Sequence, residues 1–199
     1  ACTQNDVMAN PSDRLIITDR MAQYWTHQGR LRHDAYLTTA ATLRADRPQC
    51  NARLHAQHIE KPIFIISESG QLSASDIAHL KSNSITLFHV QPLSAGKRQQ
   101  LVALGVTCFQ INLPWDIPYW ETVFEYIYQS GYHSIWCELG PKALESCVLS
   151  GCVNRLYLLK KPAMHTEGIP LSDRLLKTLA HWPSMEAQLG KLVLYTYHT

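Results

Sequence analysis

Two predicted strand-to-helix junctions carry side chains that could bind a ligand. The first is Thr38-Thr39-Ala40-Ala41-Thr42, which follows a predicted strand at His33–Leu37. Its hydroxyl groups can hydrogen-bond a ribose or an amide, and its small residues allow close approach. The second is Glu138-Leu139-Gly140-Pro141-Lys142, where a predicted strand leads into a helix. Ligands of open α/β sheets bind beyond the carboxyl ends of strands, so both junctions are candidate sites.

The second junction suits a phosphate group. Gly140 permits close backbone approach, and Pro141 fits the first position of a helix. A helix N-terminus also offers unpaired N–H groups and the positive end of the helix dipole. A Gly-Pro pair before a helix is nevertheless most often a simple turn. Taken singly, each junction is better explained as a structural turn than as a binding site.

The elements that must position these junctions alternate along the chain from Pro62 onward. Short β-branched runs predict strands at 63–66, 85–90, 106–111, 133–138 and 153–159, and helical patterns fall at 94–104, 120–128 and 142–149. This alternation predicts right-handed crossovers and an α/β fold with a mainly parallel sheet. Residues 191–198 predict an added antiparallel strand. Residues 171–187 are the hardest to interpret and suggest one short helix at 172–180.

Composition excludes several classes of protein. The chain has 199 residues, a formal net charge of +2 and 46% hydrophobic residues, which predicts one compact domain over 1–199. We expect no nucleic-acid partner because basic runs are absent from the sequence. No apolar stretch approaches the length of a bilayer span, and no signal peptide opens the chain, so we expect no membrane association.

The cysteines and histidines give no metal-site pattern. The six cysteines lack Cys-x-x-Cys pairs, so we expect buried thiols, a reducing cytoplasm and no metal. His55 and His58 are spaced for one helical face, but two histidines without a third ligand are more often surface residues than a zinc site. The His-x-Glu and Pro-Cys-x-x-Cys signature of zinc deaminases is also absent from the sequence.

Taken together and in this order, the two junctions resemble the reductase domain of the bifunctional riboflavin-biosynthesis deaminase/reductase, one of the dihydrofolate-reductase-like pyrimidine reductases. The resemblance covers 1–53, 62–69 and 134–159. It implies a dihydrofolate-reductase-like fold with a mixed, mainly parallel sheet and flanking helices. It also implies NADPH-dependent reduction of 5-amino-6-(5-phosphoribosylamino)uracil, a phosphorylated pyrimidine, to the ribitylamino product. The expected partners are a second copy in a homodimer and a fused or separate zinc deaminase.

The resemblance also assigns roles to residues. Those matching cofactor contacts of the family are Thr42, Asp46, Ser69, Gly140, Pro141, Lys142, Ala143 and Leu144. Those matching substrate contacts are Arg30, Arg53 and Glu138, and the two arginines suit a phosphate. Asp46 and Glu138 are the first candidates for catalytic carboxylates. We expect Arg30 and Arg53 to converge on one pocket; the alternative is that each pairs with a local carboxylate such as Asp34.

The sequence departs from the family at several positions. The family's Ser-x-Asp-Gly-Arg is replaced by residues 2–6, its Ser-x-Trp-Ile-Thr by residues 14–18, and its Asp-Asp-Pro by Asp46-Arg47-Pro48. Leu139 replaces a small residue and could obstruct a dinucleotide. We expect the first strand of the family to be absent or to precede Ala1. These departures predict slowed turnover, and they leave open a catalytically impaired module that serves in nucleotide binding or scaffolding.

Overall fold

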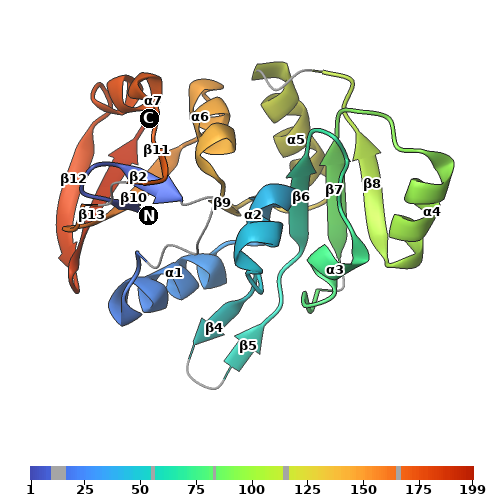
Figure 1. The fold of residues 1–199 in the computed structure, drawn as a ribbon, viewed down its shortest axis with the longest axis horizontal. Coiled ribbons are helices and arrows are strands. Elements are labelled where there is room, and N and C mark those ends of the chain that lie inside the picture. Colours follow the sequence, from blue (N-terminus) through green and yellow to red (C-terminus); the bar gives the residue numbers. More distant parts are fainter. Residues whose placement is uncertain (10–16, 55–56, 83, 114–116, 165–166) are drawn as a thin grey trace. The chain divides into compact units, whose positions relative to one another are not determined.

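The computed structural model describes residues 1–9, 17–54, 57–82, 84–113, 117–164 and 167–199 (Figure 1). The chain divides into two compact units. The central unit is His27–Leu139, and the terminal unit combines Ala1–Thr26 with Gly140–Thr199. Helix α1 (Arg20–Arg32) contributes residues to both.

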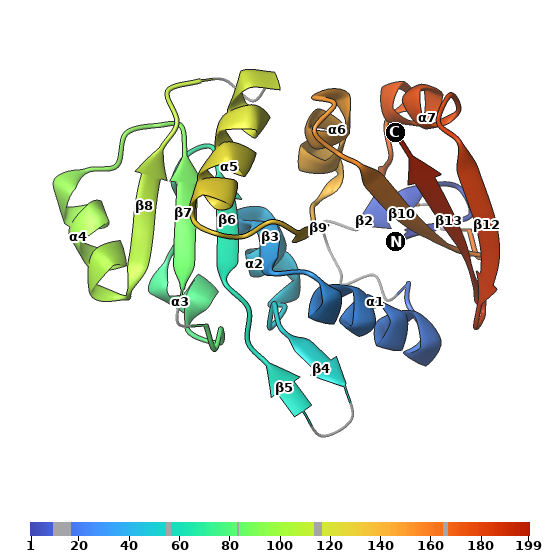
Figure 2. The same cartoon turned by 180° about the vertical axis from the view of Figure 1, so that it is seen from behind.

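A five-stranded parallel sheet forms the framework of the central unit. The elements of this unit after α1 are β3 (Ala35–Thr39), α2 (Ala40–Asp46), β4 (Ala52–Leu54), β5 (Gln57–Ile59), β6 (Ile63–Ser67), α3 (Ala74–Ile77), β7 (Ile85–His89), α4 (Ala95–Ala103), β8 (Val106–Gln110), α5 (Ile117–Gln129) and β9 (Ile135–Glu138). Every residue of β3, β6 and β7 is buried. Helices α2 and α3 cover one face of the sheet and α5 covers the other (Figures 1 and 2), as a buried parallel sheet requires.

The strand order reverses beside β3. The order is β8-β7-β6-β3-β9, so the chain moves outward from β3 through β8 and then returns to the other side of β3. The reversal therefore lies between β3 and β9, where Thr38 is in register with Glu138. Open α/β sheets bind ligands beyond the carboxyl ends of strands at such a reversal. Both predicted junctions begin at this edge.

The terminal unit has a separate four-stranded sheet. Its elements besides α1 are β1 (Cys2–Thr3), β2 (Val7–Ala9), α6 (Pro141–Leu149), β10 (Arg155–Lys161), β11 (Ile169–Pro170), α7 (Asp173–Leu179), β12 (Ser184–Leu189) and β13 (Leu192–His198). The sheet order is β1-β10-β13-β12. The predicted antiparallel strand is confirmed as β13, although it pairs with β10 in this second sheet rather than extending the first.

Apolar clusters stabilise the terminal unit. One cluster joins Val148 of α6 and Leu175 of α7 to Leu156 and Leu158 of β10. Another joins Ala22 of α1 to β10 and β13. The short helix predicted at 172–180 is confirmed as α7, and the Ser172 hydroxyl caps it by accepting a hydrogen bond from the backbone N–H of Leu175.

Some predictions need correction. The hairpin β4–β5 was missed, and because His58 lies in strand β5 its helical spacing from His55 has no structural counterpart; His55 itself is outside the described residues. A short strand, β1, lies near the start of the given sequence and pairs with β10 in parallel. The expectation about the first strand of the family stays a prediction. Among the described residues, no helix is both long enough and apolar enough to span a bilayer.

Candidate functional site

Thr39 organises the junction between β3 and α2. Its side-chain oxygen accepts a hydrogen bond from the backbone N–H of Thr42 at 3.1 Å and lies 2.9 Å from the Thr42 hydroxyl. Thr42 and Asp46 are four residues apart on α2, so they share one face of the helix. Asp46 is exposed at the last position of α2. The structure thus places two predicted cofactor residues one helical turn apart.

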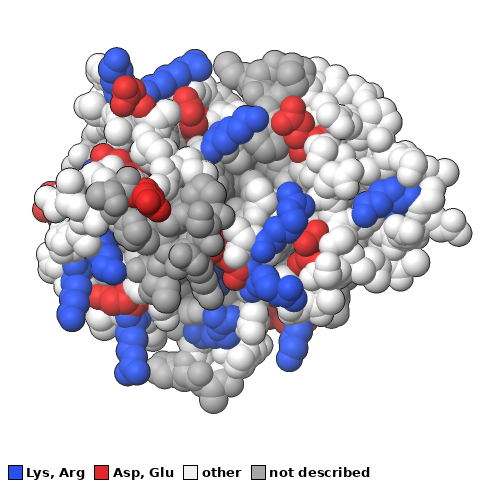
Figure 3. Space-filling model, in the orientation of Figure 1, with Lys and Arg blue, Asp and Glu red and all other residues white. Residues whose placement is uncertain are grey.

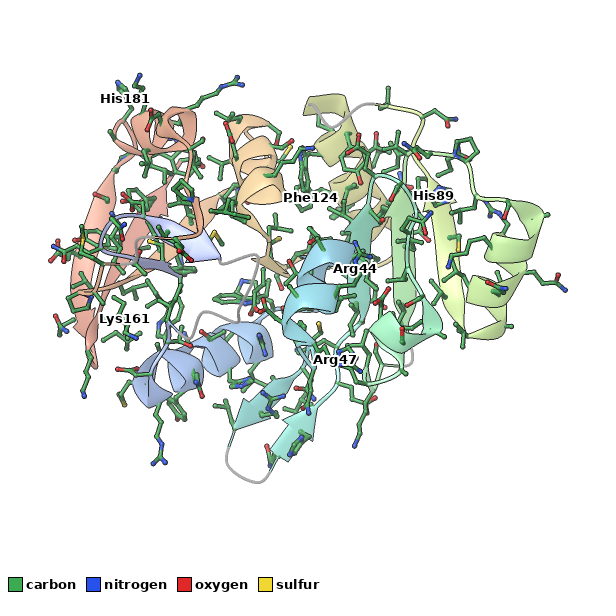
Figure 4. The ribbon with its side chains drawn as sticks, in the orientation of Figure 1. Arg44, Arg47, His89, Phe124, Lys161 and His181 are labelled. Carbon is green, nitrogen blue, oxygen red and sulfur yellow. The ribbon has the colours of Figure 1, made fainter. Side chains whose placement is uncertain are left out.

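Arg47 ends α2 in a left-handed backbone conformation with φ of 45° (Figure 4). Its N–H donates to the carbonyl of Leu43 at 3.1 Å. Asp and Asn adopt this conformation more readily than Arg does. The Asp-Asp-Pro of the family therefore suits this turn better than Asp46-Arg47-Pro48 does, and the departure has a local conformational cost.

Ser69 lies in a tight turn at the carboxyl end of β6. Gly70 has φ of 67°, and a Cβ at this glycine would lie 2.4 Å from a methyl carbon of Leu93, so the turn requires glycine. The Ser69 hydroxyl accepts a hydrogen bond from the N–H of Gln71 at 3.4 Å. Because β6 and β3 are adjacent and parallel, Ser69 and Thr42 follow neighbouring strand ends.

Glu138 is surrounded by hydrogen-bond donors from its own unit. Arg30 donates to both carboxylate oxygens, each at 2.7 Å. The Tyr36 hydroxyl donates to Oε2 and the Trp136 indole to Oε1, also at 2.7 Å. Burial opposes ionisation, but Arg30 and these hydrogen bonds lower the pKa of Glu138 below its ordinary value. Glu138 is therefore an ionised carboxylate with donors on both oxygens.

This arrangement argues against Glu138 as a catalytic acid. A carboxylate with a lowered pKa has no proton to donate at neutral pH, and four donors occupy its acceptor positions. These contacts favour a positioning role for Glu138, and its catalytic role stays a prediction. Its observed task is to hold Arg30, whose side chain is only 11% exposed.

The Arg30 guanidinium contacts other residues of the protein on several sides. Besides the Glu138 pair, its Nη1 donates to the carbonyl of Asn51 at 3.1 Å. Its Cζ lies 5.3 Å from the centre of the Tyr36 ring. Burial disfavours the charge, yet Glu138 raises the pKa of Arg30. Few donors of Arg30 therefore remain for a ligand.

Arg53 approaches the same asparagine from strand β4. Its Nη1 donates to Asn51 Oδ1 at 3.1 Å and also contacts the Gln49 side chain. Burial and then Arg30 lower the pKa of Arg53. Arg30 and Arg53 thus converge on Asn51. The alternative pairing with Asp34 is wrong, because that carboxylate accepts the backbone N–H groups of His133 and Ser134.

His27 completes the group that we call the arginine cluster, which consists of His27, Arg30, Asn51, Arg53 and Glu138. The His27 Nδ1 accepts the backbone N–H of Arg53 at 3.2 Å. Burial first, and then Arg30 and Arg53, lower the pKa of His27 to about 4, so the ring is neutral at neutral pH. Sequence reasoning missed His27, although its three-residue spacing from Arg30 on a helix was a usable signal.

The junction that begins at Gly140 belongs to the terminal unit. Gly140 caps α6 in an extended conformation without a side-chain hydrogen bond, and Pro141 follows at the first position. The N–H of Leu144 donates to the Gly140 carbonyl at 2.8 Å, while Lys142 is exposed and Ala143 is buried. The first turn of α6 thus presents backbone N–H groups that no cap side chain covers.

Leu139 does not have the exposure expected of an obstructing side chain. It is buried, with 6% exposure. Replacing a buried leucine by glycine leaves a cavity, so Leu139→Gly is expected to destabilise the protein. The burial of Leu139 gives little support to the expectation that its side chain obstructs a dinucleotide, and that expectation stays a prediction.

Positive and negative side chains are interspersed on the face shown in Figure 3. In the described part of the chain, no group of three or more His, Cys, Asp or Glu side chains is placed to hold a metal ion. The arginine cluster and the carboxyl edge of the parallel sheet are the features that point to ligand chemistry.

Solved structures identify the class of fold. RibD from Acinetobacter baumannii, in its form 2, matches with a TM-score of 0.78 and 17% identity over 99% of this chain and 55% of that one. A pyrimidine reductase-like protein from Corynebacterium diphtheriae matches with a TM-score of 0.76 and 16% identity over 99% of this chain and 88% of that one. The chain has the dihydrofolate-reductase-like fold of pyrimidine reductases, as predicted.

Sequence comparison identifies the family. Residues 6–169 match the family described as the RibD C-terminal domain, and the chain belongs to that family. The riboflavin biosynthesis protein RibD of Bacillus amyloliquefaciens is 25% identical over 155 residues, which cover 76% of this chain and 41% of that protein. The chain thus spans less than half the length of this curated relative. The predicted family resemblance is confirmed.

Proposed function

We propose that the chain is an NADPH-dependent reductase of riboflavin biosynthesis. Its substrate is 5-amino-6-(5-phosphoribosylamino)uracil, in which C1′ of the ring-opened ribosyl group accepts a hydride and the group becomes ribityl. The observation that carries the proposal is the family match over residues 6–169. The reversal of strand order beside β3 supports it, because it provides the kind of edge at which α/β folds bind nucleotides.

Each unit, taken by itself, offers groups that fit part of a dinucleotide. In the central unit, Thr42, Asp46 and Ser69 follow the ends of two adjacent strands and offer groups for hydrogen bonds. In the terminal unit, the uncapped first turn of α6 from Gly140 to Leu144 suits a phosphate. When bound, the nicotinamide supplies the hydride, and the protein orients the substrate carbon.

The arginine cluster is the proposed substrate-binding region. The Arg53 guanidinium offers donors for the substrate phosphate. The hydrogen-bonded pair of Arg30 and Glu138 lies in the same cluster and positions the surrounding residues. Reduction also consumes one proton. With Glu138 ionised and saturated, Asp46 is the predicted carboxylate that remains to be tested for a role in proton transfer.

The proposal extends to partners and location. A structurally similar protein from Thermotoga maritima is both a deaminase and a reductase, and this chain covers 54% of it. We propose that a zinc deaminase, fused or separate, supplies the substrate by deaminating the pyrimidine, that the reductase is a homodimer, and that it works in the cytoplasm.

The decisive experiment supplies the substrate and NADPH to the 199-residue chain. We expect loss of NADPH absorbance and a ribitylamino product of matching amount by mass spectrometry, with a slower reaction with NADH. Turnover on the order of 1 s⁻¹ would show that the sequence departures are tolerated. NADPH binding without any product would instead indicate the catalytically impaired module, and absence of both would refute the proposed function.

A further inference from the structure

Strand β12 forms the outer edge of the four-stranded sheet in the terminal unit (Figures 1 and 2). It pairs with β13 on one side, and in the described part of the chain no strand pairs with its other side. Every residue of β12 except Leu189 is exposed. The strand therefore presents a row of backbone groups that is accessible to a further strand.

The hydrogen bonds to β13 show which backbone groups of β12 point outward. Just before the strand, the carbonyl of Pro183 accepts the N–H of His198 at 3.0 Å. In an antiparallel ladder, alternate residues direct their N–H and carbonyl groups to the same neighbour. Those directed to β13 therefore belong to Met185, Ala187 and Leu189. Those directed outward belong to Ser184, Glu186 and Gln188.

The β12 edge lacks the features that discourage pairing with a further strand. Natural edge strands are commonly protected by lysine, proline, a β-bulge or short length. β12 has six residues, with neither lysine nor proline among them, and its register with β13 runs from Ser184 to Leu189 without a shift. The opposite edge of the same sheet differs, because β1 has only two residues. The β12 edge is therefore the better template for strand addition.

The apolar side chains of β12 fit an antiparallel copy of the same strand. Met185, Ala187 and Leu189 alternate along β12, so they lie on one face of the sheet. On that face their neighbours in β13 include Leu192 and Leu194, which are buried in an apolar cluster. If a two-fold axis passes beside Ala187, this residue faces its own copy and Met185 faces Leu189 of the second copy. The apolar face then continues from one chain into the other.

The polar side chains of β12 fit the same register. With the axis at Ala187, Glu186 faces Gln188 of the second copy, and these are the residues whose backbone groups point outward. The Gln188 amide donates to the Gly190 carbonyl at 2.8 Å and has a second N–H that suits a carboxylate. An axis at Glu186 would instead place two carboxylates opposite each other, which is unfavourable. The residue pattern therefore favours the axis at Ala187.

We propose that two copies of this chain associate through β12, whose strands pair antiparallel about a two-fold axis at Ala187 and join two sheets into one. This inference rests on the homodimer proposed above and deepens it by naming its surface. Pairing of one patch with itself closes the assembly at two copies. Because a six-residue strand pair buries less surface than most permanent dimers, we expect a dissociation constant on the order of micromolar.

Two lysine substitutions test the surface and its register. Ala187→Lys places two ammonium groups opposite each other, so we expect the dissociation constant from analytical ultracentrifugation to rise about 5- to 20-fold. Gln188→Lys adds the same charge to the same exposed strand but opposite Glu186 of the second copy, so the dimer should be kept or tightened by up to about fivefold. Equal effects of the two substitutions would overturn the proposal. A wild type that stays monomeric at about 100 μM would also overturn it and leave the edge to a strand of another protein.

Cysteine crosslinking tests the same register by distance. In Ala187→Cys the two new thiols face each other, with Cβ atoms about 5 Å apart, so mild oxidation should give a disulfide-linked dimer on a non-reducing gel. Glu186→Cys is the matched control, because its two copies lie diagonally, about 7–8 Å apart, and should crosslink poorly. The wild type, oxidised in the same way, gives the background from the six native cysteines. Crosslinking at position 186 but not at 187 would contradict the proposed axis.

The two hypotheses fail in different ways. If the chain reduces the riboflavin-pathway substrate as a monomer, or as a dimer that Ala187→Lys leaves intact, the β12 inference is wrong and the reductase function stands. If the chain dimerises and crosslinks at position 187 but forms no product with NADPH, the reductase function is wrong and the β12 surface stands. Thermal melting of each variant, matched to the wild type, confirms that the comparison concerns folded protein.

Discussion

Arg30 and Arg53 both reach Asn51, but their surroundings differ. Arg30 lies against Glu138, Tyr36 and the backbone of Asn51, and its side chain is 11% exposed. Among the described residues, the Arg53 guanidinium donates to uncharged side chains through Nη1 and makes no hydrogen bond through Nε or Nη2. The resemblance assigns both arginines to substrate binding, yet their surroundings differ. We propose that Arg30, whose donors are paired within the protein, shapes the site and that Arg53 contacts the ligand.

The largest expected effect comes from breaking the Arg30–Glu138 pair. Removing one partner leaves a largely buried charge, so Arg30→Met or Glu138→Leu should each lower the free energy of unfolding by about 2–4 kcal/mol in urea titrations. The double variant should lose less than the sum of the two. Arg53→Met is the control and should change stability by less than about 1 kcal/mol. Equal losses at Arg30 and Arg53 would remove the distinction between them.

A smaller effect is expected where α1 meets Trp136. A Cβ at Gly29 would lie 2.4 Å from the Trp136 ring, whose indole holds Glu138. Gly29→Ala should cost about 1–2 kcal/mol through overpacking, even after the gain in helix propensity. Gly96 of α4 is the matched control, because nothing lies within 4 Å of its Cβ position. Gly96→Ala should stabilise the protein by about 0.5 kcal/mol; stabilisation by Gly29→Ala as well would contradict the packing argument.

The smallest effect concerns pH on the Arg53 side. His27 has its pKa lowered from 6.5 to about 4, so the unfolded chain binds a proton between these values that the folded chain does not. The stability contributed by this difference is therefore complete above pH 6.5 and is lost as the pH falls toward 4. Allowing for solvent screening, we expect a loss of about 1 kcal/mol from pH 7 to pH 4.5 that is missing in His27→Gln. Identical pH profiles for both proteins would count against the buried, neutral ring.

Some elements could be predicted from the sequence because their local residue pattern matches the environment in which they lie. The apolar strand β6 is buried along its whole length, and Ser94 with Gly105 marks the two ends of α4. Strand β12 was missed because its side chains are almost all exposed, so neither alternation nor an apolar run distinguishes it. Its pairing with β13 depends on partner hydrogen bonds that no local pattern reveals.

The residues that make up the candidate site could be predicted from the sequence, but the role of each residue could not. The resemblance named Arg30, Arg53 and Glu138, and the structure brings all three into one cluster. The proposed role of each residue depends on which of its hydrogen-bond donors are paired within the protein. That pairing arises from tertiary packing and cannot be read from the sequence. The departures at 14–16 lie outside the described residues, so their expected effect on turnover stays a prediction.

The pairing of β9 with β3 has a consequence for the nascent chain. Arg30 and Glu138 are separated by 108 positions, so the ribosome needs roughly 5–20 s to supply the partner of an arginine already synthesised. Strand β3 can pair with β6 much sooner, while its other edge waits for β9. During this interval the unpaired edge is open to wrong partners, including another growing copy. The candidate site at this edge is therefore the last part of the central sheet to form.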